Sequence, residues 1–229
     1  MSKINNIIIF VGGRGTRLGD ITKRTPKPLI TFNSVEFIYY QLNLLSILKP
    51  KQIILLCGYK KYLFKKKFHN KVYKGIKIKC LFEKRLLGTG GSLKKAKKYI
   101  VNNTLVCNGD TYFDYNFQKL NNIQFDKILL ILVKNKIYKS NNKLANLSVI
   151  KKNLIFKKKS IYMNSGFYLL NKNFQVYLKK NIFSLENDII EKLINNKIVN
   201  GIKAEGNHID IGTKKNLNFF KKYSKKINL

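Results

Sequence analysis

Tryptophan is absent from this chain of 229 residues, which also has only three prolines, two histidines and 11 acidic residues. Hydrophobic residues nevertheless make up 45% of the sequence. That much apolar surface can offset the entropy lost on ordering, so a disordered chain is excluded. The first apolar run, Ile7–Val11, is far too short for a secretion signal or a membrane span. We therefore expect a soluble cytoplasmic protein.

Negative charge is scarce, whereas Lys and Arg together number 46, which gives a net charge of +35 and a pI near 10.1. Two interpretations stay open. The charge can serve binding to nucleic acid or an anionic membrane surface. It can also be compositional drift of a solvated surface, because Asn and Ile are abundant too, as an A/T-rich coding sequence produces. The lysines form no single block, which favours drift.

The three cysteines are too few and too far apart for a disulfide framework. Cys57, Cys80 and Cys107 show no Cys-x-x-Cys spacing, and each lies in an apolar, strand-like run. This pattern predicts buried thiols in a reducing compartment.

Short apolar runs alternate with helix-like stretches over the first two thirds of the chain. We expect strands at Ile4–Val11, Gln52–Cys57, Ile76–Phe82 and Thr104–Cys107, and helices at Glu36–Leu48, Tyr59–Phe68 and Ser92–Ile100. This alternation predicts an α/β fold: a Rossmann-like, mainly parallel sheet flanked by helices on both faces. Such sheets bind ligands at the carboxyl ends of their strands.

Strands dominate the chain from about Phe125 onward. We expect them at 128–133, 144–150, 154–156 and 161–170, then a helix over 185–194, a strand near 198–203 and a last helix through Lys222. These strands indicate either an extension that makes the sheet mixed or a small β-rich lid over the site. No internal repeat or linker is present, so one domain over 1–229 is expected. The Lys/Asn-rich stretch Asn135–Lys143 is the best candidate for a mobile loop.

A glycine-rich loop directly after the first strand is the strongest functional signal. It reads Gly12-Gly13-Arg14-Gly15-Thr16-Arg17. Glycines let the backbone approach a ligand closely and turn its N–H groups toward an anion. The spacing fits neither a Walker A loop nor the dinucleotide fingerprint. Three of the four arginines lie at positions 14–24, where planar bidentate donors suit phosphate oxygens.

A lysine held between two prolines follows this loop, in Pro26-Lys27-Pro28. Prolines fix the backbone on either side and would hold the ammonium over the glycine loop.

With these two motifs in order, the sequence resembles the sugar-1-phosphate nucleotidyltransferases. Further segments are similar to family motifs in the same order: Glu83-Lys84-Arg85-Leu86-Leu87-Gly88-Thr89-Gly90-Gly91, Asn108-Gly109-Asp110, Asn164-Ser165-Gly166-Phe167-Tyr168 and Asp210-Ile211-Gly212-Thr213. The resemblance covers nearly the whole chain and implies a fold of the nucleotide-diphospho-sugar transferase type. The compact length and the Leu-Gly-Thr-Gly-Gly form look most like bacterial D-glycero-D-manno-heptose 1-phosphate guanylyltransferases.

The resemblance implies that a nucleoside triphosphate and a sugar 1-phosphate give a nucleoside-diphosphate sugar and pyrophosphate, for capsule or lipopolysaccharide synthesis. Arg17 and Lys27 would be catalytic, because in-line transfer needs positioning and charge neutralisation. Asp110 and Asp210 would hold Mg²⁺ or Mn²⁺. The nucleotide would be bound by Val11, Gly12, Gly13, Arg14, Gly15, Thr16, Glu83, Gly88 and Thr89. Residues 1–124 would form the nucleotide-binding half and 125–229 the sugar-phosphate-binding half.

Glu83 occupies the position that faces the base in the family. Guanine presents N1–H and N2–H₂ as donors, and an ionised carboxylate accepts both, whereas the carbonyl oxygens of uracil or thymine would repel it. Glu83 therefore favours GTP.

The sugar side departs from the family pattern. Asn108, Lys159 and Asn164 are the residues expected to bind the sugar phosphate. Lys158, however, stands where the family has a glutamate for sugar hydroxyls, which reverses the hydrogen-bond sense. The acceptor can thus be a heptose or mannose 1-phosphate whose hydroxyls are bound by Asn164, or another molecule.

Two alternatives stay open beside guanylyl transfer. One is a cytidylyl, uridylyl or thymidylyl transferase that acts on another phosphorylated acceptor. The other is a basic nucleic-acid-binding protein, although no RNA-binding signature is present. The resemblance implies no specific nucleic-acid partner and no membrane insertion. The sequence leaves the oligomeric state undecided, with a homodimer among the options.

Overall fold

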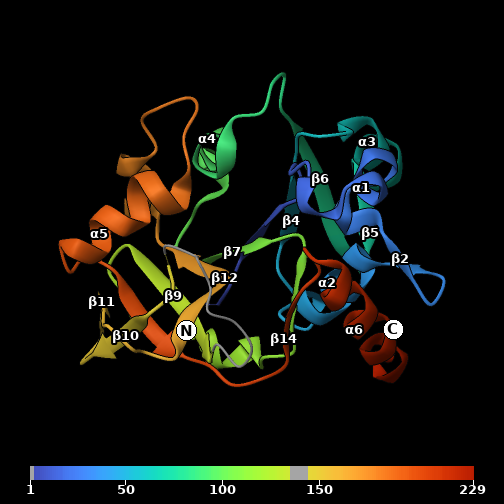
Figure 1. The fold of residues 1–229 in the computed structure, drawn as a ribbon. Coiled ribbons are helices and arrows are strands. Elements are labelled where there is room, and N and C mark those ends of the chain that lie inside the picture. The colour runs from blue at the N-terminus through green and yellow to red at the C-terminus, as the bar shows by residue number, and fades with distance from the viewer. Residues whose placement is uncertain (1–2, 135–143) are drawn as a thin grey trace.

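A computed structural model describes residues 3–134 and 144–229. It confirms the α/β class, with a central sheet of ten strands in the order β10-β11-β13-β9-β12-β7-β1-β4-β6-β5 (Figure 1). The first half of the chain contributes β1 (Asn6–Phe10), β4 (Gln52–Cys57), β5 (Lys71–Tyr73), β6 (Ile76–Phe82) and β7 (Thr104–Asn108). The second half contributes β9 (Ile128–Lys134), β10 (Leu147–Ile150), β11 (Asn153–Phe156), β12 (Tyr162–Leu170) and β13 (Asn200–Lys203).

Four neighbouring strands, β7, β1, β4 and β6, are parallel, as the sequence predicted. The central strand β1 is apolar on both sides, and Ile7, Ile8 and Ile9 are all fully buried. An uninterrupted apolar run suits a strand that is covered on both faces, which is the usual situation in a parallel sheet. The carboxyl ends of these strands lie at one edge of the sheet. The glycine loop emerges there after β1, the Glu83 segment after β6 and the Gly109–Asp110 turn after β7.

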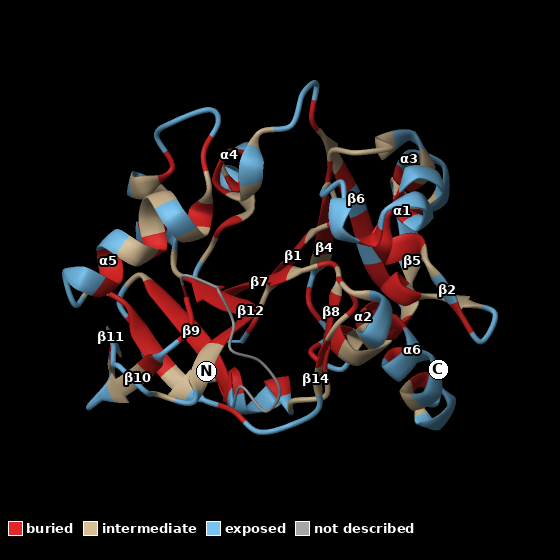
Figure 2. Ribbon diagram, in the orientation of Figure 1, coloured by how far each residue is buried: buried red, intermediate tan, exposed pale blue. Residues whose placement is uncertain are grey.

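Helices cover both faces of the sheet (Figure 2). On one face, α2 (Phe37–Ser46) and α3 (Lys61–Phe68) supply Ile38, Leu42 and Phe64 to the core. On the other, α4 (Gly88–Lys95) and α5 (Glu191–Asn195) supply Leu93 and Leu193. In α2 and α3 these residues recur at helical spacing, so each helix buries one apolar stripe.

The later strands continue the same sheet. Of the two expectations for them, a sheet extension or a β-rich lid, the structure has the extension. β12 is antiparallel to both of its neighbours, β7 and β9, and β13 is parallel to β9. The sheet is therefore mixed. A strand from the second half of the chain lies between two strands that precede it in sequence.

A small second layer joins the end of the chain to the middle. β8 (Thr111–Phe113) pairs with β14 (His208–Asp210), and α6 (Lys214–Tyr223) follows. Phe220 of α6 packs edge-on against Phe37 and Tyr40 of α2, beside the hairpin of β2 (Thr31–Phe32) and β3 (Val35–Glu36). This layer fixes the positions of Asp110, which directly precedes β8, and Asp210, which is the last residue of β14.

Some boundaries differ from the expectations. The helix expected over Ser92–Ile100 begins earlier, at Gly88, and ends at Lys95, with a 3₁₀ turn over Lys97–Tyr99. The helix expected over 185–194 consists of a π-helical turn, Glu186–Ile190, followed by α5. The expected mobile loop, Asn135–Lys143, lies outside the described residues. A short helix, α1 (Asp20–Arg24), follows the glycine loop.

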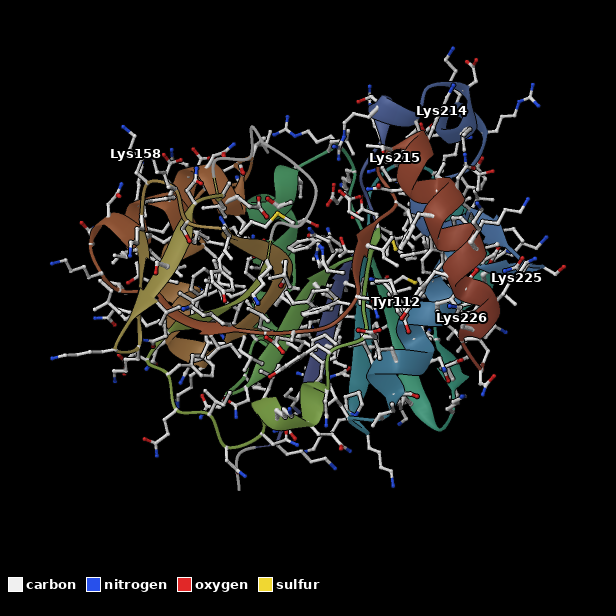
Figure 3. All side chains as sticks on the ribbon, turned by 60° about the horizontal axis from the view of Figure 1, so that its bottom comes forward. Tyr112, Lys158, Lys214, Lys215, Lys225 and Lys226 are labelled. Carbon is white, nitrogen blue, oxygen red and sulfur yellow. The ribbon has the colours of Figure 1, made fainter. Side chains whose placement is uncertain are left out.

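Lysine side chains project outward around the molecule, among them Lys158 and, far from it on the opposite side, Lys225 (Figure 3). All three cysteines are buried and free. Among residues 3–134 and 144–229, no helix is long and apolar enough to cross a membrane.

Candidate active site

The glycine loop follows β1 and lies against the end of β4. A Cβ on Gly12 would lie only 2.5 Å from the backbone nitrogen of Gly58, so no larger residue fits there without backbone movement. Tyr59 N donates to Gly12 O at 2.9 Å and ties the two loops together. Close backbone approach is the reason for glycine at this point. Gly13 next to it faces open space, and Arg14 and Thr16 are exposed.

Lys27 packs against Gly15 of this loop, as the position of Lys27 between two prolines predicted. Gly15 has a left-handed backbone with φ of 68°, and a Cβ there would lie 2.9 Å from Lys27 Cε. The Thr22 hydroxyl donates to Gly15 O at 3.0 Å and holds the turn from behind. The Lys27 side chain is only 8% exposed, so most of it is shielded from water.

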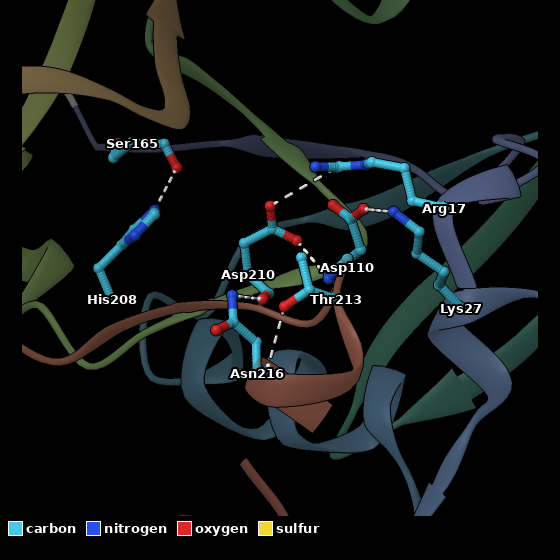
Figure 4. A network of polar contacts seen from close by, with 9 residues as sticks. Arg17, Lys27, Asp110, Ser165, His208, Asp210, Thr213 and Asn216 are labelled. Atoms are coloured by element: carbon cyan, nitrogen blue, oxygen red, sulfur yellow. Dashed lines mark hydrogen bonds and ion pairs between the residues drawn. The ribbon is translucent and has the colours of Figure 1, made fainter. Parts of the chain in front are cut away.

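Two carboxylates and two cations from four distant segments meet at the carboxyl end of β7 (Figure 4). Lys27 Nζ lies 2.6 Å from Asp110 Oδ2, and Arg17 lies 3.8 Å from Asp210 Oδ2. A Cβ on Gly212 would lie 2.7 Å from Asp210 Oδ1 and 2.8 Å from an Arg17 nitrogen, so glycine leaves the room for this pair. We call Arg17, Lys27, Asp110 and Asp210 the charge quartet. Its formal charges cancel.

The quartet includes two carboxylates, whose oxygens are the kind of ligand that hard divalent cations prefer. Burial raises the pKa of Asp210, the negative charge of Asp110 raises it further, and Lys27, Arg17 and the Gly212 N–H oppose both. The two carboxylates are therefore close enough to repel each other, and a cation between them would relieve that repulsion. Among the described residues no group of three His, Cys, Asp or Glu side chains could hold a metal ion. A site with two carboxylates would complete its coordination with phosphate oxygens and water.

The turn that carries Asp110 is held from below by Gln41 of α2, a residue that the sequence analysis did not assign. Gln41 Nε2 donates to Asn108 O at 2.7 Å and to Thr111 O at 2.5 Å. Gln41 is buried on the apolar side of α2, and a glutamine among core positions is the signal that could have drawn attention to it. Gly109 lets the turn pack on β1, because a Cβ there would lie 2.5 Å from Phe10 O.

Glu83, at the end of β6, lines a cavity of about 390 Å³ on the other side of the glycine loop. Its carboxylate is buried, and Oε2 accepts from Leu87 N at 3.2 Å. Gly58 faces it, because a Cβ there would lie 3.0 Å from Oε2. The cavity lining also includes five cations: Arg14, Lys60, Lys61, Lys84 and Arg85. A single buried acceptor among cations suits a planar ligand that offers N–H groups and carries phosphates.

The predicted sugar-side residues Asn108 and Asn164 both lie next to Gly166, because β12 runs antiparallel to β7 and Phe167 pairs with Cys107 near the end of β7. A Cβ on Gly166 would lie 2.5 Å from Asn108 Nδ2. Asn164 Oδ1 accepts from Gly166 N at 3.0 Å, and its Nδ2 donates to Tyr168 Oη at 2.8 Å. Lys159 lies apart, in the exposed turn between β11 and β12. Within the described part of the chain it makes no hydrogen bond or ion pair with the other predicted residues.

The Gly88–Gly91 segment begins α4 and packs against Phe183. Gly88 has φ of 72° and, like Gly90, leaves no room for a Cβ beside Phe183. The Thr89 hydroxyl donates to Glu186 Oε2 at 2.6 Å and accepts from Leu185 N at 2.8 Å. These contacts give the glycines and Thr89 a packing role, which the sequence motif alone did not reveal.

His208 neighbours the quartet but faces away from it (Figure 4). Its Nε2 lies 2.8 Å from Ser165 O, and burial lowers its pKa. A neutral ring that donates to a carbonyl links β14 to β12, which is a structural role.

Comparisons with known proteins agree with this geometry. The Nucleotidyl transferase family matches residues 6–224. The chain is 36% identical over 187 residues to a D-glycero-α-D-manno-heptose 1-phosphate guanylyltransferase of Campylobacter jejuni, covering 78% of this chain and 82% of that one. It is 33% identical over 214 residues to the enzyme with the same name from Aneurinibacillus thermoaerophilus, covering 90% and 92%. The crystal structure of HddC from Yersinia pseudotuberculosis superposes with a TM-score of 0.78 at 25% identity, covering 96% of this chain and 99% of that chain. On these matches, the chain belongs to the nucleotidyl transferase family.

Proposed function

We propose that this enzyme transfers a guanylyl group from GTP to a sugar 1-phosphate, a heptose 1-phosphate first and mannose 1-phosphate second, and releases pyrophosphate. The observation that carries the proposal is the charge quartet at the carboxyl end of the parallel strands. Phosphoryl-type transfer needs charge neutralisation and alignment more than covalent help, and the quartet offers both. The two bacterial heptose 1-phosphate guanylyltransferases support the choice of substrates.

The chemical step balances without a further reactant. A phosphate oxygen of the sugar 1-phosphate attacks the α-phosphorus, and the bond from that phosphorus to the oxygen bridging to the β-phosphorus breaks. The electron pair of the broken bond leaves with pyrophosphate. Lys27 would bind the α-phosphate as charge grows there, and Arg17 the leaving pyrophosphate. Gly12, Gly13 and Gly15, with Val11, Arg14 and Thr16, would line the phosphate path.

Asp110 and Asp210 would hold Mg²⁺ or Mn²⁺ in this enzyme, and the ion would neutralise phosphate charge. Their carboxylates repel each other, and a cation bound between them would relieve that repulsion. Lys27 would then turn from Asp110 toward the α-phosphate. The same ammonium thus has two partners, Asp110 before the substrate binds and phosphate afterwards.

Glu83 supports guanine as the base. Its buried carboxylate has acceptor capacity beyond the one N–H that it receives from Leu87, and guanine offers adjacent N1–H and N2–H₂ donors. The cations around the cavity suit the triphosphate.

On the acceptor side, we propose that residues 125–229 bind the sugar phosphate, with Asn108, Asn164 and Lys159 as its contacts, and that residues 1–124 bind the nucleotide. The bonds that Asn164 makes use its oxygen and one N–H, which leaves a second N–H for a sugar oxygen. The cytoplasm is the compartment that we propose, because it keeps thiols such as the three buried cysteines reduced. The product would supply surface-glycan synthesis.

The test is pyrophosphate release by the purified protein with each of GTP, ATP, UTP and CTP against heptose and mannose 1-phosphates, with Mg²⁺ present. We expect the highest kcat/KM with GTP. A preference for UTP or CTP would contradict the guanylyl assignment.

A second experiment tests the alternative that the positive charge serves to bind nucleic acids. Labelled duplex DNA is titrated with the protein across salt concentrations, and a binding constant that falls steeply with salt near physiological ionic strength would support this alternative.

A further inference from the structure

Glu186 lies between two of the predicted binding segments, although no motif marked it. Its Oε2 accepts from the Thr89 hydroxyl of the nucleotide-side motif at 2.6 Å. Its Oε1 accepts from the Tyr168 hydroxyl at 3.3 Å, and Tyr168 in turn accepts from Asn164 of the sugar-side motif. One carboxylate therefore joins the segment after β6 to the segment that begins β12.

The partners of Glu186 are hydroxyl groups rather than cations. Thr89, Ser184 and Tyr168 all donate to it. Within residues 3–134 and 144–229, no Lys or Arg lies within 4.0 Å of its carboxylate. Asp20 and Glu36, by contrast, each pair with a lysine. The surroundings of Glu186 are thus built to present hydroxyls to a carboxylate.

The direction of these hydrogen bonds leaves one carboxylate oxygen of Glu186 able to accept a further hydrogen bond. The Asn164 amide can only donate through Nδ2, so the Tyr168 oxygen accepts from it and the Tyr168 proton points to Glu186. Burial and the charge of Glu186 raise the pKa of Tyr168, which keeps that proton in place. Oε2 receives two hydroxyls, at 2.6 and 3.1 Å, whereas Oε1 receives only the longer bond from Tyr168. Oε1 has acceptor capacity for a further donor.

The position of Glu186 suits a sugar. It begins the π-helical turn Glu186–Ile190, and such turns are frequent at functional sites. Through Tyr168 it is tied to Asn164, which lies beside Asn108 at the carboxyl end of β7. Glu186 as a whole residue is half-buried.

We propose that Glu186 Oε1 accepts a hydrogen bond from a hydroxyl of the sugar, and so supplies the carboxylate that the chain lacks at Lys158. The inference rests on the proposed function, because it names a contact with its acceptor substrate. Asn164 and Tyr168 act as positioning residues that hold Glu186 while its Oε1 keeps acceptor capacity for a further donor.

The experiment compares wild type with Glu186→Gln, and with Glu205→Gln as the matched control. Glu205 is a suitable control because it is an 88% exposed acid whose ion-pair partner is Lys134, outside the predicted site residues. Pyrophosphate release is measured with the preferred nucleotide while the sugar 1-phosphate is varied. We expect Glu186→Gln to raise the KM for the sugar 1-phosphate roughly ten- to a hundredfold, the effect of one lost charge-assisted hydrogen bond, and to change the KM for the nucleotide little.

Deoxy analogues of the sugar 1-phosphate separate recognition from packing. In wild type, removal of the one hydroxyl that Glu186 binds should lower kcat/KM for the sugar 1-phosphate. In Glu186→Gln, removal of the same hydroxyl should leave kcat/KM unchanged. A purely structural Glu186 would give equal losses in both proteins, and that result would overturn the inference. Tyr168→Phe keeps the ring but loses the positioning bond, so it should raise the same KM by a smaller factor. Melting temperatures show whether each variant is folded.

The two proposals fail in different ways. A wild type that prefers UTP or CTP contradicts guanylyl transfer, but the comparison of Glu186→Gln still stands, because it uses whichever nucleotide is preferred. A Glu186→Gln variant that is folded, binds nucleotide normally and keeps its KM for every sugar 1-phosphate overturns only the role of Glu186. A wild type that releases no pyrophosphate with any pair overturns both.

Discussion

Lys27 Nζ lies 2.6 Å from Asp110 Oδ2, and the two side chains are 8% and 26% exposed. The residues are 83 positions apart, so this ion pair joins the Pro-Lys-Pro segment to the end of β7. Partial burial makes the pair stronger than an exposed one, because water screens it less. Each charge neutralises the other in this structure.

Replacement of Lys27 by Ala should lower kcat about a hundredfold or more, because the lost ammonium contributes roughly 3 kcal/mol to the transition state. Steady-state pyrophosphate release checks this. Lys23→Ala is the control, since Lys23 is an exposed lysine paired only with Asp20 at the surface. An unchanged kcat with a raised KM would place Lys27 in ground-state binding instead.

Asp210→Asn should abolish metal-dependent turnover and yet raise the melting temperature near neutral pH. Burial and the charge of Asp110 raise the pKa of Asp210, so the folded state disfavours its ionised form relative to the unfolded chain. Ionisation of Asp210 therefore destabilises the folded state at any pH at which the unfolded chain carries this carboxylate ionised. An amide cannot ionise, so Asp210→Asn removes this destabilisation.

Thermal melts of both proteins, near neutral pH and near pH 3, measure the effect. The difference in melting temperature should shrink in acid, where wild-type Asp210 is protonated too. Glu205→Gln controls for loss of an acid from a strongly basic chain. Normal turnover of Asp210→Asn with Mg²⁺ would exclude Asp210 from the metal site.

Glu83→Gln should weaken GTP and improve UTP in relative terms. A glutamine offers one acceptor and one donor, which match O4 and N3–H of uracil. The ratio of kcat/KM for GTP to that for UTP should fall roughly ten- to a hundredfold, the effect of about 1.5–3 kcal/mol from one charge-assisted hydrogen bond. An unchanged ratio would show that Glu83 supports only the Leu87 turn.

Acid should weaken the fold through His208. Burial lowers the pKa of its ring, so the unfolded chain takes up a proton at higher pH than the folded one. The stabilisation is present above the unfolded pKa of about 6.5 and is lost as the pH falls below it. Urea unfolding between about pH 7.5 and 5.5 should show this slope, and His208→Gln should flatten it. Equal slopes would mean that the ring is protonated in the folded protein as well.

The sequence predicted the parallel half of the sheet well, because β1, β4 and β7 are largely apolar runs that end near Gly12, Gly58 and Asn108, and β6 alternates apolar with lysine residues at strand spacing. It also placed Lys27 over Gly15 correctly, since prolines and glycines act through the local backbone. It did not predict that β12 lies between β7 and β9, or that β14 pairs with β8. Those pairings depend on contacts between distant segments, which no local pattern encodes.

The site shows the same division. The sequence assigned Arg17, Lys27, Asp110 and Asp210 to one site through its resemblance to a family, but it did not predict that Arg17 pairs with Asp210 or Lys27 with Asp110. Glu186 was not assigned at all, because it stands in an ordinary amphipathic stretch. Its significance arises only from Thr89 and Tyr168, which are far away in sequence and meet it in the folded protein. Gln41 is similar, since its two carbonyl partners belong to a turn that packs on α2 only after folding.

The strand order constrains how the chain can be made. β7 pairs with β1 on one side and with β12 on the other, and β12 ends at Leu170. During translation the ribosome releases β7 long before β12, so the nascent chain exposes an open hydrogen-bonding edge of an apolar sheet. Such edges pair with other chains and promote aggregation. A fragment ending at residue 124 would keep that edge unpaired, so the first half of the sheet needs β12 from the second half to cover it.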